Sequence, residues 1–438
     1  MIIVKSTQRP CHKRPSSAIL TFLGCDFAPL ILSSKLKKLK RLRILQIFSR
    51  YLQPGGEENS VYRIGDTLQA DHDVEYFIGS TQELMGHSLS DRISAPFRAF
   101  ANLPIRQRLL KYQALGHFDL WLIHNVLPGL SPSVYTTAFS LGIPVVHYLH
   151  NYRMGCINGF FLNHGQPCER CISGNFWPAF QTACWHDSHL ISGWMGLVTR
   201  RIRHLHVFSK VRAWIALSES QRIKHEQMGI PAARLHVIPH FYQPRESPPP
   251  PCLNGNVLFL GRLSSEKGVD LLLHAWKSVS PQGRKLVIAG GGPESEKLKA
   301  LASSLHLKDV EFLGYLSPER QRAVWAQSAF SVIPSIWREP FGLVLLEAWA
   351  QARPCVAFRA GALEELIHHG VDGLLADPLS PASLGKQIQF LIDRPSPCVS
   401  MGEAGRNRIL TEFAPATWSQ KINPVLQKTL LISAIHDS

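Results

Sequence analysis

The sequence has no long apolar run. No stretch of about 18 or more consecutive apolar residues occurs, and a helix needs roughly that length to span a bilayer. The most apolar early segment, residues 18–32, is short and contains Asp26 and Pro29. A secretory signal carries its basic residues before the apolar stretch, whereas here the basic cluster at residues 35–43 follows it. The sequence therefore indicates a cytoplasmic protein.

Acidic residues are almost missing from the start of the chain. Residues 1–50 hold eleven Lys and Arg against one acid, Asp26, a net charge of +10 out of +15 for the whole chain. Such a segment could attract an anionic membrane surface, at about 1 kcal/mol per charge, and so place the protein at the inner face of the membrane. Nucleic acid is not an expected partner. The alternatives are a disordered extension and a start codon assigned too early.

Cysteine is scarce, and its number is odd, which argues against a disulfide framework in so long a chain. Four of the nine cysteines fall within 29 residues, at Cys156, Cys168, Cys171 and Cys184. One Cys-x2-Cys pair with two flanking thiols can supply four ligands to a structural Zn²⁺, and an iron–sulfur cluster is allowed by the same ligands. Reduced structural thiols, or a disulfide formed during isolation, are the alternatives. We expect these four cysteines to form a metal site.

Apolar strand-like runs alternate with helical runs along most of the chain, which is typical of an α/β fold with parallel, doubly wound sheets. The predicted strands are 43–48, 120–124, 145–149, 212–217, 235–238, 257–260, 285–289, 310–312, 330–334 and 355–358. The predicted helices are 59–69, 268–279, 294–305, 318–327, 341–352 and 416–432. Two Rossmann-like domains facing across a cleft are therefore predicted, with ligands beyond the carboxyl ends of the strands.

A proline-rich stretch divides the chain. Residues 243–255 contain Pro-Pro-Pro-Pro, which cannot continue a sheet and is typical of a stiff linker. We place a first Rossmann-like domain at 44–242 and a second at 256–415. Residues 1–43 form the basic extension. Residues 416–438 form a final helix that could pack back on the first domain.

The segment after the strand at 330–334 contains two acids eight residues apart. Pro340 suits the first turn of a helix, which puts Glu339 at the loop–helix junction and Glu347 about two turns later, about 12 Å away. Free amides near Phe341 and Gly342 would face an anion. The pattern fits an elongated ligand with polar ends and an anionic middle, as in a nucleotide sugar. A capped amphipathic helix with incidental acids is the alternative.

Positive charge comes from the loop after the strand at 257–260. Arg262 and Lys267 could converge on a diphosphate leaving group and do the work that Mg²⁺ does in other enzymes, so no catalytic metal is expected. Gly55 and Gly56 would let the backbone of the other domain approach a phosphate closely. Gly-Gly also serves any tight turn, and the same ambiguity applies to residues 290–293.

A set of motifs along the sequence resembles that of family 4 of the retaining glycosyltransferases, which have the GT-B architecture. The cysteine cluster resembles that of a bacterial polysaccharide-assembly branch of this family. The matching motifs, in order, are Gly55-Gly-Glu-Glu58, His124-Asn125, His150-Asn-Tyr-Arg153, Ser218-Glu219, Gly261-Arg262 with Lys267, Gly290-Gly-Gly-Pro293, Glu339-x7-Glu347 and Gly361 through Glu365.

The resemblance implies roles for the residues of the donor site. Arg262 and Lys267 would neutralise the donor diphosphate, and Gly56 would approach it from the first domain. Glu339 and the amides after it would hold the transferred sugar and a phosphate, and Glu347 would bind the ribose hydroxyls. Catalysis would consist mostly of positioning and of stabilising leaving-group charge.

The resemblance also implies that the domain at 44–242 binds the acceptor and that the domain at 256–415 binds the nucleotide sugar. His150 would then face the reacting sugar from the acceptor-binding domain. Transfer would retain the anomeric configuration, with the leaving phosphate taking the acceptor's proton. Two features depart from the family pattern. His240 stands where the family usually has Asn, and residues 1–43 have no counterpart.

The sequence thus predicts a glycosyltransferase that moves a sugar from a nucleotide-diphosphate sugar to a glycan or to an acceptor linked to polyprenyl diphosphate, in cell-surface polysaccharide synthesis. A nucleotide-sugar epimerase of the same architecture is one alternative, since it would consume donor without acceptor. An inactive, metal-containing scaffold that binds nucleotide sugars is another.

Overall fold

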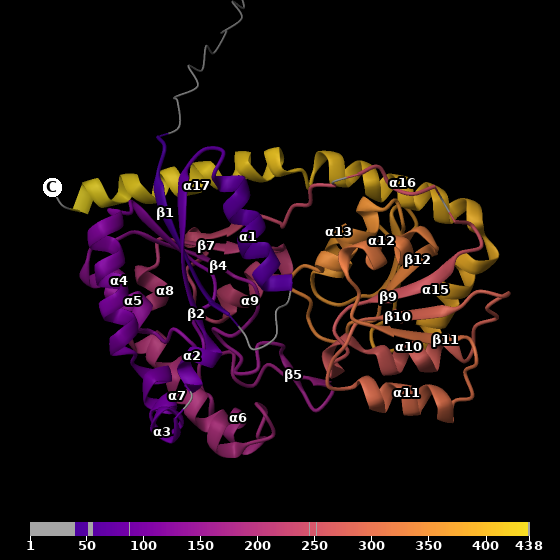
Figure 1. Ribbon diagram of the computed structural model, residues 1–438, viewed down its shortest axis with the longest axis horizontal. Helices are drawn as coiled ribbons and strands as arrows, with labels where there is room; N and C mark the ends of the chain where they lie inside the picture. Colours follow the sequence, from indigo (N-terminus) through magenta and orange to yellow (C-terminus); the bar gives the residue numbers. More distant parts are fainter. Residues whose placement is uncertain (1–39, 51–55, 87, 245, 251, 437–438) are drawn as a thin grey trace, which may run out of the picture. The chain divides into compact units, whose positions relative to one another are not determined.

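A computed structural model describes residues 40–50, 56–86, 88–244, 246–250 and 252–436. These residues form two six-stranded parallel sheets, each with helices from its own half of the chain (Figure 1). The predicted α/β class with two Rossmann-like halves is confirmed. Gly55 and the basic residues before Lys40 lie outside the described residues.

The first sheet has the strand order β2-β1-β3-β4-β7-β8. Its strands are β1 (Arg43–Arg50), β2 (Asp73–Ser80), β3 (Leu120–Ile123), β4 (Val145–Tyr148), β7 (Ala213–Ala216) and β8 (Leu235–Val237). Its helices are α1 (Gly56–Leu68), α2 (Thr81–Met85), α3 (Leu89–Phe100), α4 (Leu103–Gly116), α5 (Ser133–Ser140), α6 (Trp177–Gln181), α7 (His189–His204), α8 (Val207–Lys210) and α9 (Glu219–Gln227). Strands β3, β4 and β7 are buried along their whole length, which explains their continuous apolar sequences.

The second sheet has the order β11-β10-β9-β12-β13-β14. Its strands are β9 (Asn256–Leu260), β10 (Leu286–Ala289), β11 (Val310–Gly314), β12 (Ser328–Ile333), β13 (Cys355–Phe358) and β14 (Gly373–Ala376). Its helices are α10 (Val269–Trp276), α11 (Ser295–Ser304), α12 (Pro318–Ala326), α13 (Leu343–Ala350), α14 (Ala362–Leu366), α15 (Pro381–Asp393) and α16 (Pro395–Thr411).

Some elements have no counterpart among the predicted ones. Strand β2 has exposed and half-buried residues alternating at an edge of the sheet, so its sequence has no buried apolar run. Strand β14 is a four-residue edge strand. The two-residue strands β5 (Leu162–Asn163) and β6 (Gln166–Pro167) form a small hairpin inside the cysteine-bearing segment. Local pattern was too weak to indicate any of them.

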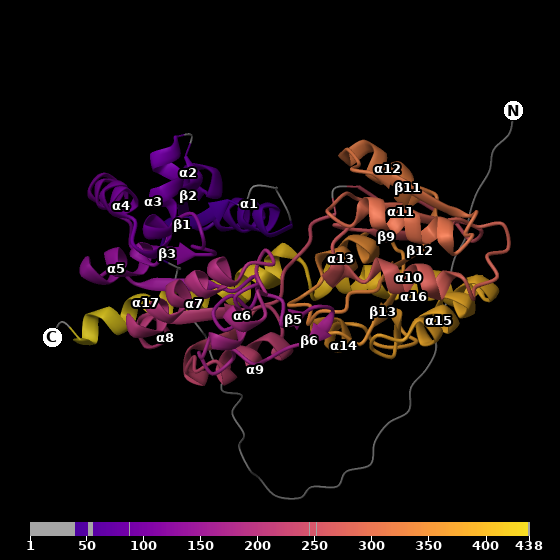
Figure 2. The same ribbon diagram turned by 90° about the horizontal axis from the view of Figure 1, so that it is seen from below.

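The last helix, α17 (Pro415–His436), packs on the first half of the chain. It contacts α1 and β4, and both views of the ribbon show it running along the first-sheet elements (Figures 1 and 2). The Asn423 side chain bonds His72 at 3.2 Å, and the Trp418 indole donates to the Tyr148 hydroxyl at 3.3 Å. In the described part of the chain, no helix is both long enough and apolar enough to cross a bilayer.

Candidate functional site

Three loops at the carboxyl edge of the second sheet approach one another at backbone distance. A Cβ on Gly268, which has φ +63°, would come within 2.1 Å of the Pro334 carbonyl oxygen. A Cβ on Gly290 would meet the Gly261 carbonyl oxygen at 1.8 Å. Glycine at position 268 lets the loop carrying Arg262 and Lys267 lie directly on the loop after β12, and glycine at position 290 lets the loop after β10 lie on the start of that same loop.

That packing brings Lys267 and Glu339 together. The Lys267 ammonium lies 2.5 Å from a carboxylate oxygen of Glu339, and the Ser335 hydroxyl donates to the same oxygen at 2.9 Å. The Lys267 ammonium also lies 5.2 Å from the centre of the Trp337 ring. The Glu339 side chain is only 6% exposed and that of Lys267 26%. The pair therefore holds a fixed charge arrangement with part of the ammonium open to a ligand.

Arg262 stands apart from this pair. Its side chain is exposed on the loop after β9, and among the residues that the structure describes the guanidinium has no hydrogen-bond or ion-pair partner. The structure therefore places both predicted cations on one loop but joins only Lys267 directly to Glu339. A guanidinium left in solvent remains available for an anion.

The backbone of Glu339 is held by the loop after β13. Gly361 has φ +59°, and a Cβ there would lie 2.4 Å from the Glu339 carbonyl oxygen. The Ala362 amide donates to that oxygen at 2.8 Å. This contact explains why the Gly361 region belongs to the motif set.

The predicted start of the helix after Glu339 is wrong. Helix α13 begins at Leu343, because Gly342 adopts φ +98° and interrupts the helical backbone, so Pro340 is in the preceding loop. Only the later part of the interval between Glu339 and Glu347 is helical. Among the described residues, the amides of Phe341 and Gly342 donate no hydrogen bond, so they are free to meet an anion.

Glu347 lies half-buried on α13 and faces the first half of the chain. Burial raises the pKa of its carboxyl to about 7, and the positive charge of Arg63 on α1 opposes that rise. Gly56 begins α1, and a Cβ there would meet the Leu343 side chain at 3.3 Å. The starts of α1 and α13 are therefore neighbours, as the donor hypothesis requires of Gly56. Arg63 was not predicted, because nothing local in the sequence marks it.

His150 follows β4 and belongs to a stack of aromatic and imidazole rings. Its Nε2 lies 2.9 Å from Nδ1 of His124, whose Nε2 lies 2.6 Å from the Gln46 amide oxygen. The centre of the His240 ring lies 5.7 Å from that of the His150 ring and 5.3 Å from that of the Phe341 ring. Burial lowers the pKa of His150 to about 3, so the imidazole is neutral at pH 7. His240 thus links the histidine pair to the loop between β12 and α13, which carries Glu339 and Phe341 and is called the donor loop below.

Glu57 is a site residue to which the sequence assigned no role. Burial raises the pKa of its carboxyl to about 7, and Arg153 and the Asn151 amide oppose the rise. The Asn151 side chain donates to one carboxyl oxygen at 3.3 Å, while the other is buried without a hydrogen-bond partner among the described residues. The Gly-Gly-Glu-Glu motif was the available signal. This orphan oxygen lies beside the segment that follows His150.

Contacts between the two halves surround this region. The Glu365 carboxylate accepts from the amides of Glu219 and Ser220 at 2.9 and 3.0 Å, at the start of α9. The Ser218 hydroxyl donates to the Pro340 carbonyl at 2.9 Å. Arg338 lies 3.3 Å from Glu169. Polar groups from the first half therefore bind the donor loop directly.

The four clustered cysteines line one small cavity and are free thiols. Burial, with the other three thiols, raises the pKa of Cys184 to about 12, and burial also raises that of Cys171 to about 11. The Cys156 thiol donates to the Asn158 side chain at 3.0 Å, and Cys168 accepts from Arg170 at 3.5 Å. In the described residues, no three His, Cys, Asp or Glu side chains stand in an arrangement that could hold a metal ion.

Two family models cover most of the chain. The model for glycosyl transferases group 1 matches residues 254–408, and the model for glycosyltransferase family 4 matches residues 54–246. An uncharacterized glycosyltransferase of Methanocaldococcus jannaschii is 38% identical over 130 residues, 29% of this chain and 33% of that protein. The alpha-D-kanosaminyltransferase of Streptomyces kanamyceticus is 32% identical over 142 residues, 32% and 36% of the two chains. The match thus spans about a third of each relative.

Solved structures resemble the whole fold. The Anabaena protein HepE, in complex with UDP and glucose, aligns with a TM-score of 0.65 at 19% identity, over 89% of this chain and 100% of its own. Sucrose-phosphate synthase from Thermosynechococcus elongatus gives a TM-score of 0.66 at 19% identity, over 90% and 100%. With the two sheets and the motif residues at their facing loops, these matches place the chain in family 4 of the glycosyltransferases, with the GT-B architecture.

Proposed function

We propose that the protein is a retaining glycosyltransferase that moves a sugar from a nucleotide-diphosphate sugar to a glycan or lipid-linked acceptor in cell-surface polysaccharide synthesis. The observation that carries the proposal is the Lys267–Glu339 pair beside the free amides of Phe341 and Gly342. Together they offer an ammonium and two N–H donors to a diphosphate, and a carboxylate to sugar hydroxyls. HepE, which has the same fold, was solved with UDP and glucose.

Each of these groups has a physical task in the transfer. Lys267 and the exposed Arg262 compensate the charge that develops on the leaving diphosphate. Glu339 accepts hydrogen bonds from the sugar, and Glu347 accepts them from the ribose. The neutral imidazole of His150 can donate to, or accept from, the reacting sugar without adding a charge. Catalysis then depends on positioning and on exclusion of water.

The acceptor side of the proposal uses the first half of the chain. Within the part of the chain that the structure describes, one carboxyl oxygen of Glu57 is buried without a partner, and an acceptor hydroxyl would satisfy it. An acceptor carried on polyprenyl diphosphate would bring the enzyme to the inner face of a membrane.

We also propose a structural zinc ion held by Cys156, Cys168, Cys171 and Cys184. The donor chemistry fits, because four thiols border one cavity. Their present spacing is not that of a ligand set, so binding would draw the thiols together. The ion would close the loop between Cys156 and Cys184, and four thiolates leave no position open for catalysis.

The donor site is tested by separating phosphate binding from nucleoside binding. A thermal-shift panel of nucleotide-diphosphate sugars, UDP-glucose included, identifies the donor. We then expect Lys267→Ala and Arg262→Ala each to weaken binding of the corresponding nucleoside diphosphate about tenfold or more, because each removes a charged hydrogen bond, and to leave the free nucleoside unaffected. The exposed Lys277 at the end of α10 provides the control, Lys277→Ala.

Unchanged diphosphate affinity in both variants would show that the phosphate site lies elsewhere. An assay without acceptor separates the rival functions. Conversion of the donor to its epimer would indicate the epimerase. Stable donor binding without hydrolysis in this assay, and without transfer when acceptor is added, would indicate the inactive scaffold.

A further inference from the structure

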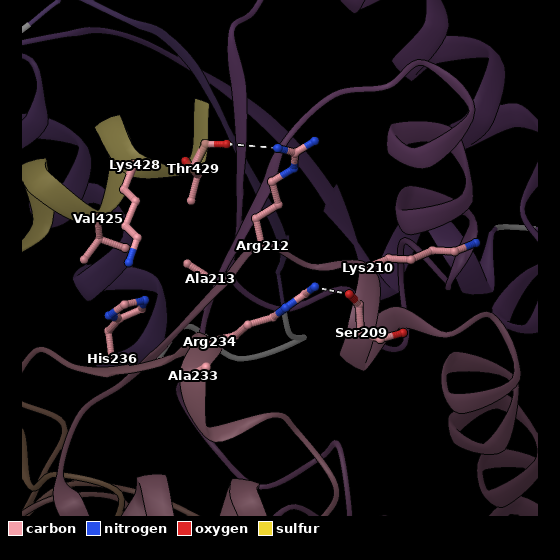
Figure 3. Close-up of a pocket in the computed structure, with 10 residues that line it drawn as sticks. All are labelled: Ser209, Lys210, Arg212, Ala213, Ala233, Arg234, His236, Val425, Lys428 and Thr429. Atoms are coloured by element: carbon pink, nitrogen blue, oxygen red, sulfur yellow. Dashed lines mark hydrogen bonds between the residues drawn. The ribbon is translucent and has the colours of Figure 1, made fainter. Parts of the chain in front are cut away.

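A polar cavity lies away from the loops that carry Arg262, Lys267 and Glu339. Its volume is about 270 Å³, and its polar lining includes Arg212, Arg234, His236 and Lys428 (Figure 3). At about 30 Å³ per water molecule, the cavity has room for several waters, and therefore for a phosphate or diphosphate group.

The position of the cavity follows from strand direction. Arg212 directly precedes β7, and Arg234 directly precedes β8, and these strands are parallel. The cavity therefore lies at the amino ends of the strands, whereas His150 follows the carboxyl end of β4. Parallel strands present these ends at opposite edges of a sheet. The cavity is thus separate from the donor site proposed above and does not depend on it.

Two guanidinium groups on one side are held in place by backbone carbonyls. Arg212 donates to the Thr429 carbonyl at 3.3 Å. Arg234 donates to the Val211 carbonyl at 2.8 Å and also to the Ser209 carbonyl. Both bonds of Arg234 come from one nitrogen of a planar, five-donor group. The position of Arg234 is therefore set by contacts that an incoming anion need not replace.

The other side is formed by α17 and β8. Figure 3 shows Lys428 extending from α17 toward His236, with the small Ala213 side chain between this pair and the arginines. Burial lowers the pKa of His236, and the charge of Lys428 lowers it further. No Asp or Glu is among the described residues that line the cavity. Positive groups therefore converge here without an acidic side chain in the lining.

Lys210 also borders the cavity but plays a different part. Its ammonium lies 5.4 Å from the centre of the Phe139 ring, and in Figure 3 the side chain points away from the other cations. We leave it out of the ligand set.

We propose that this cavity is a second anion site, which binds a phosphate or diphosphate group through Arg212, Arg234 and Lys428. Two fixed guanidinium groups and a mobile ammonium are suited to a tetrahedral, multiply charged anion. Since Lys428 belongs to α17 and the arginines belong to the first sheet, the anion would fasten the last helix to the amino ends of β7 and β8. Both a lipid headgroup and a soluble phosphate have this chemistry.

The test uses the full chain with the donor cations removed, Arg262→Ala with Lys267→Ala, so that pyrophosphate binding at the donor site does not interfere. Calorimetric titration with pyrophosphate should show one site. Adding Lys428→Ala should weaken that site about tenfold, and Lys428→Glu should abolish it, because a charged hydrogen bond is lost and then a repulsion introduced. Lys421→Ala, an exposed position on the same helix, should have no effect.

Absence of pyrophosphate binding in the donor-site background would overturn the proposal, and so would equal affinity in the Lys428→Glu and Lys421→Ala variants. Failure of the donor hypothesis would look different, since Arg262→Ala and Lys267→Ala would then leave total pyrophosphate binding unchanged while Lys428→Ala still reduced it.

A second arm identifies the source of the anion. The full chain is sedimented with phosphatidylcholine vesicles, with and without phosphatidylglycerol, and the fraction of protein bound to the vesicles is measured. If the natural ligand is a lipid headgroup, Lys428→Glu should lower the fraction bound to the vesicles that contain phosphatidylglycerol. Vesicle binding equal to that of the parent, together with lost pyrophosphate binding, supports a soluble phosphate instead.

Discussion

Two carboxyl groups of the site, Glu57 and Glu347, one from each half of the chain, share the same physical state. Burial raises the pKa of each to about 7, although a nearby arginine opposes the change in both. Burying an ionised carboxylate costs free energy unless it is paired. Such groups are retained where a ligand supplies the missing hydrogen bonds, and ribose or acceptor hydroxyls would do so here.

The state of Glu347 gives a stability prediction. A carboxyl whose pKa is higher in the folded chain binds more protons in the folded than in the unfolded state. The contribution of Glu347 to the free energy of unfolding therefore falls as pH rises from about 4.5 to about 7, and it stays level above that. Glu347→Gln removes this loss. We expect the difference in melting temperature between the variant and the wild type to be about 2–4 °C larger, in favour of the variant, at pH 8 than at pH 5.

Thermal denaturation at the two pH values measures the effect without ligand. Glu296→Gln, at an exposed position on α11, is the control and should follow the wild type at both. A Glu347→Gln variant with the wild-type pH dependence would show that this carboxyl is not buried as described.

At the scale of elements, the segment between Cys156 and Cys184 differs from the rest of the first half. It contains only the short hairpin β5–β6 and the five-residue helix α6, so regular secondary structure contributes little to its stability. The segment is held by buried side chains in the core of the first half, among them Ile157, Phe161 and Phe176. Zinc bound by the four thiols around one cavity would add a second constraint.

The zinc prediction is measured by elemental analysis of protein purified without chelator. We expect about one equivalent of zinc, falling strongly in Cys171→Ser, because three remaining thiols hold the ion less tightly. Cys252→Ser, outside the cluster, should keep its zinc. A content below about 0.1 equivalent in the wild type would rule out the site, since a structural metal is not lost in purification.

At the scale of the whole molecule, directed polar contacts join the two halves in addition to a hydrophobic cluster that contains residues of both. Glu365 on α14 binds the first amides of α9, where the partial positive charge of a helix start favours a carboxylate. Ser218, which caps the same helix, binds the Pro340 carbonyl in the donor loop. Loss of one such contact should loosen the hold of the first half on the donor loop.

Glu365→Ala tests this connection. Removing a carboxylate from a helix start costs about 0.5–2 kcal/mol, so we expect the KM for donor to rise roughly three- to thirty-fold while binding of the free nucleoside is little changed. Glu364→Ala is a matched control, because Glu364 is on the same helix and pairs with Arg359 at 3.6 Å in its own half. Equal kinetics in the two variants would show that the contact does not influence the donor site.

Local sequence patterns were sufficient to predict the α/β class and the strands that precede Arg262, Lys267, Glu339 and His150. These strands depend on neighbouring residues, since a buried strand needs an apolar run. The same reasoning failed at β2, whose alternating polar residues reflect its place at a sheet edge. It also failed at α13, whose start depends on the backbone angle of Gly342.

Tertiary structure decided which of these residues meet. The 2.5 Å pairing of Lys267 with Glu339, the approach of Arg63 to Glu347 and the cavity formed by Arg212, Arg234 and Lys428 each join residues far apart in the chain. A sequence fixes the chemistry of a side chain but not its distance from another loop. That distance, together with burial, sets the charge state of a group and the ligand it can bind, so it appears only when both sheets are folded.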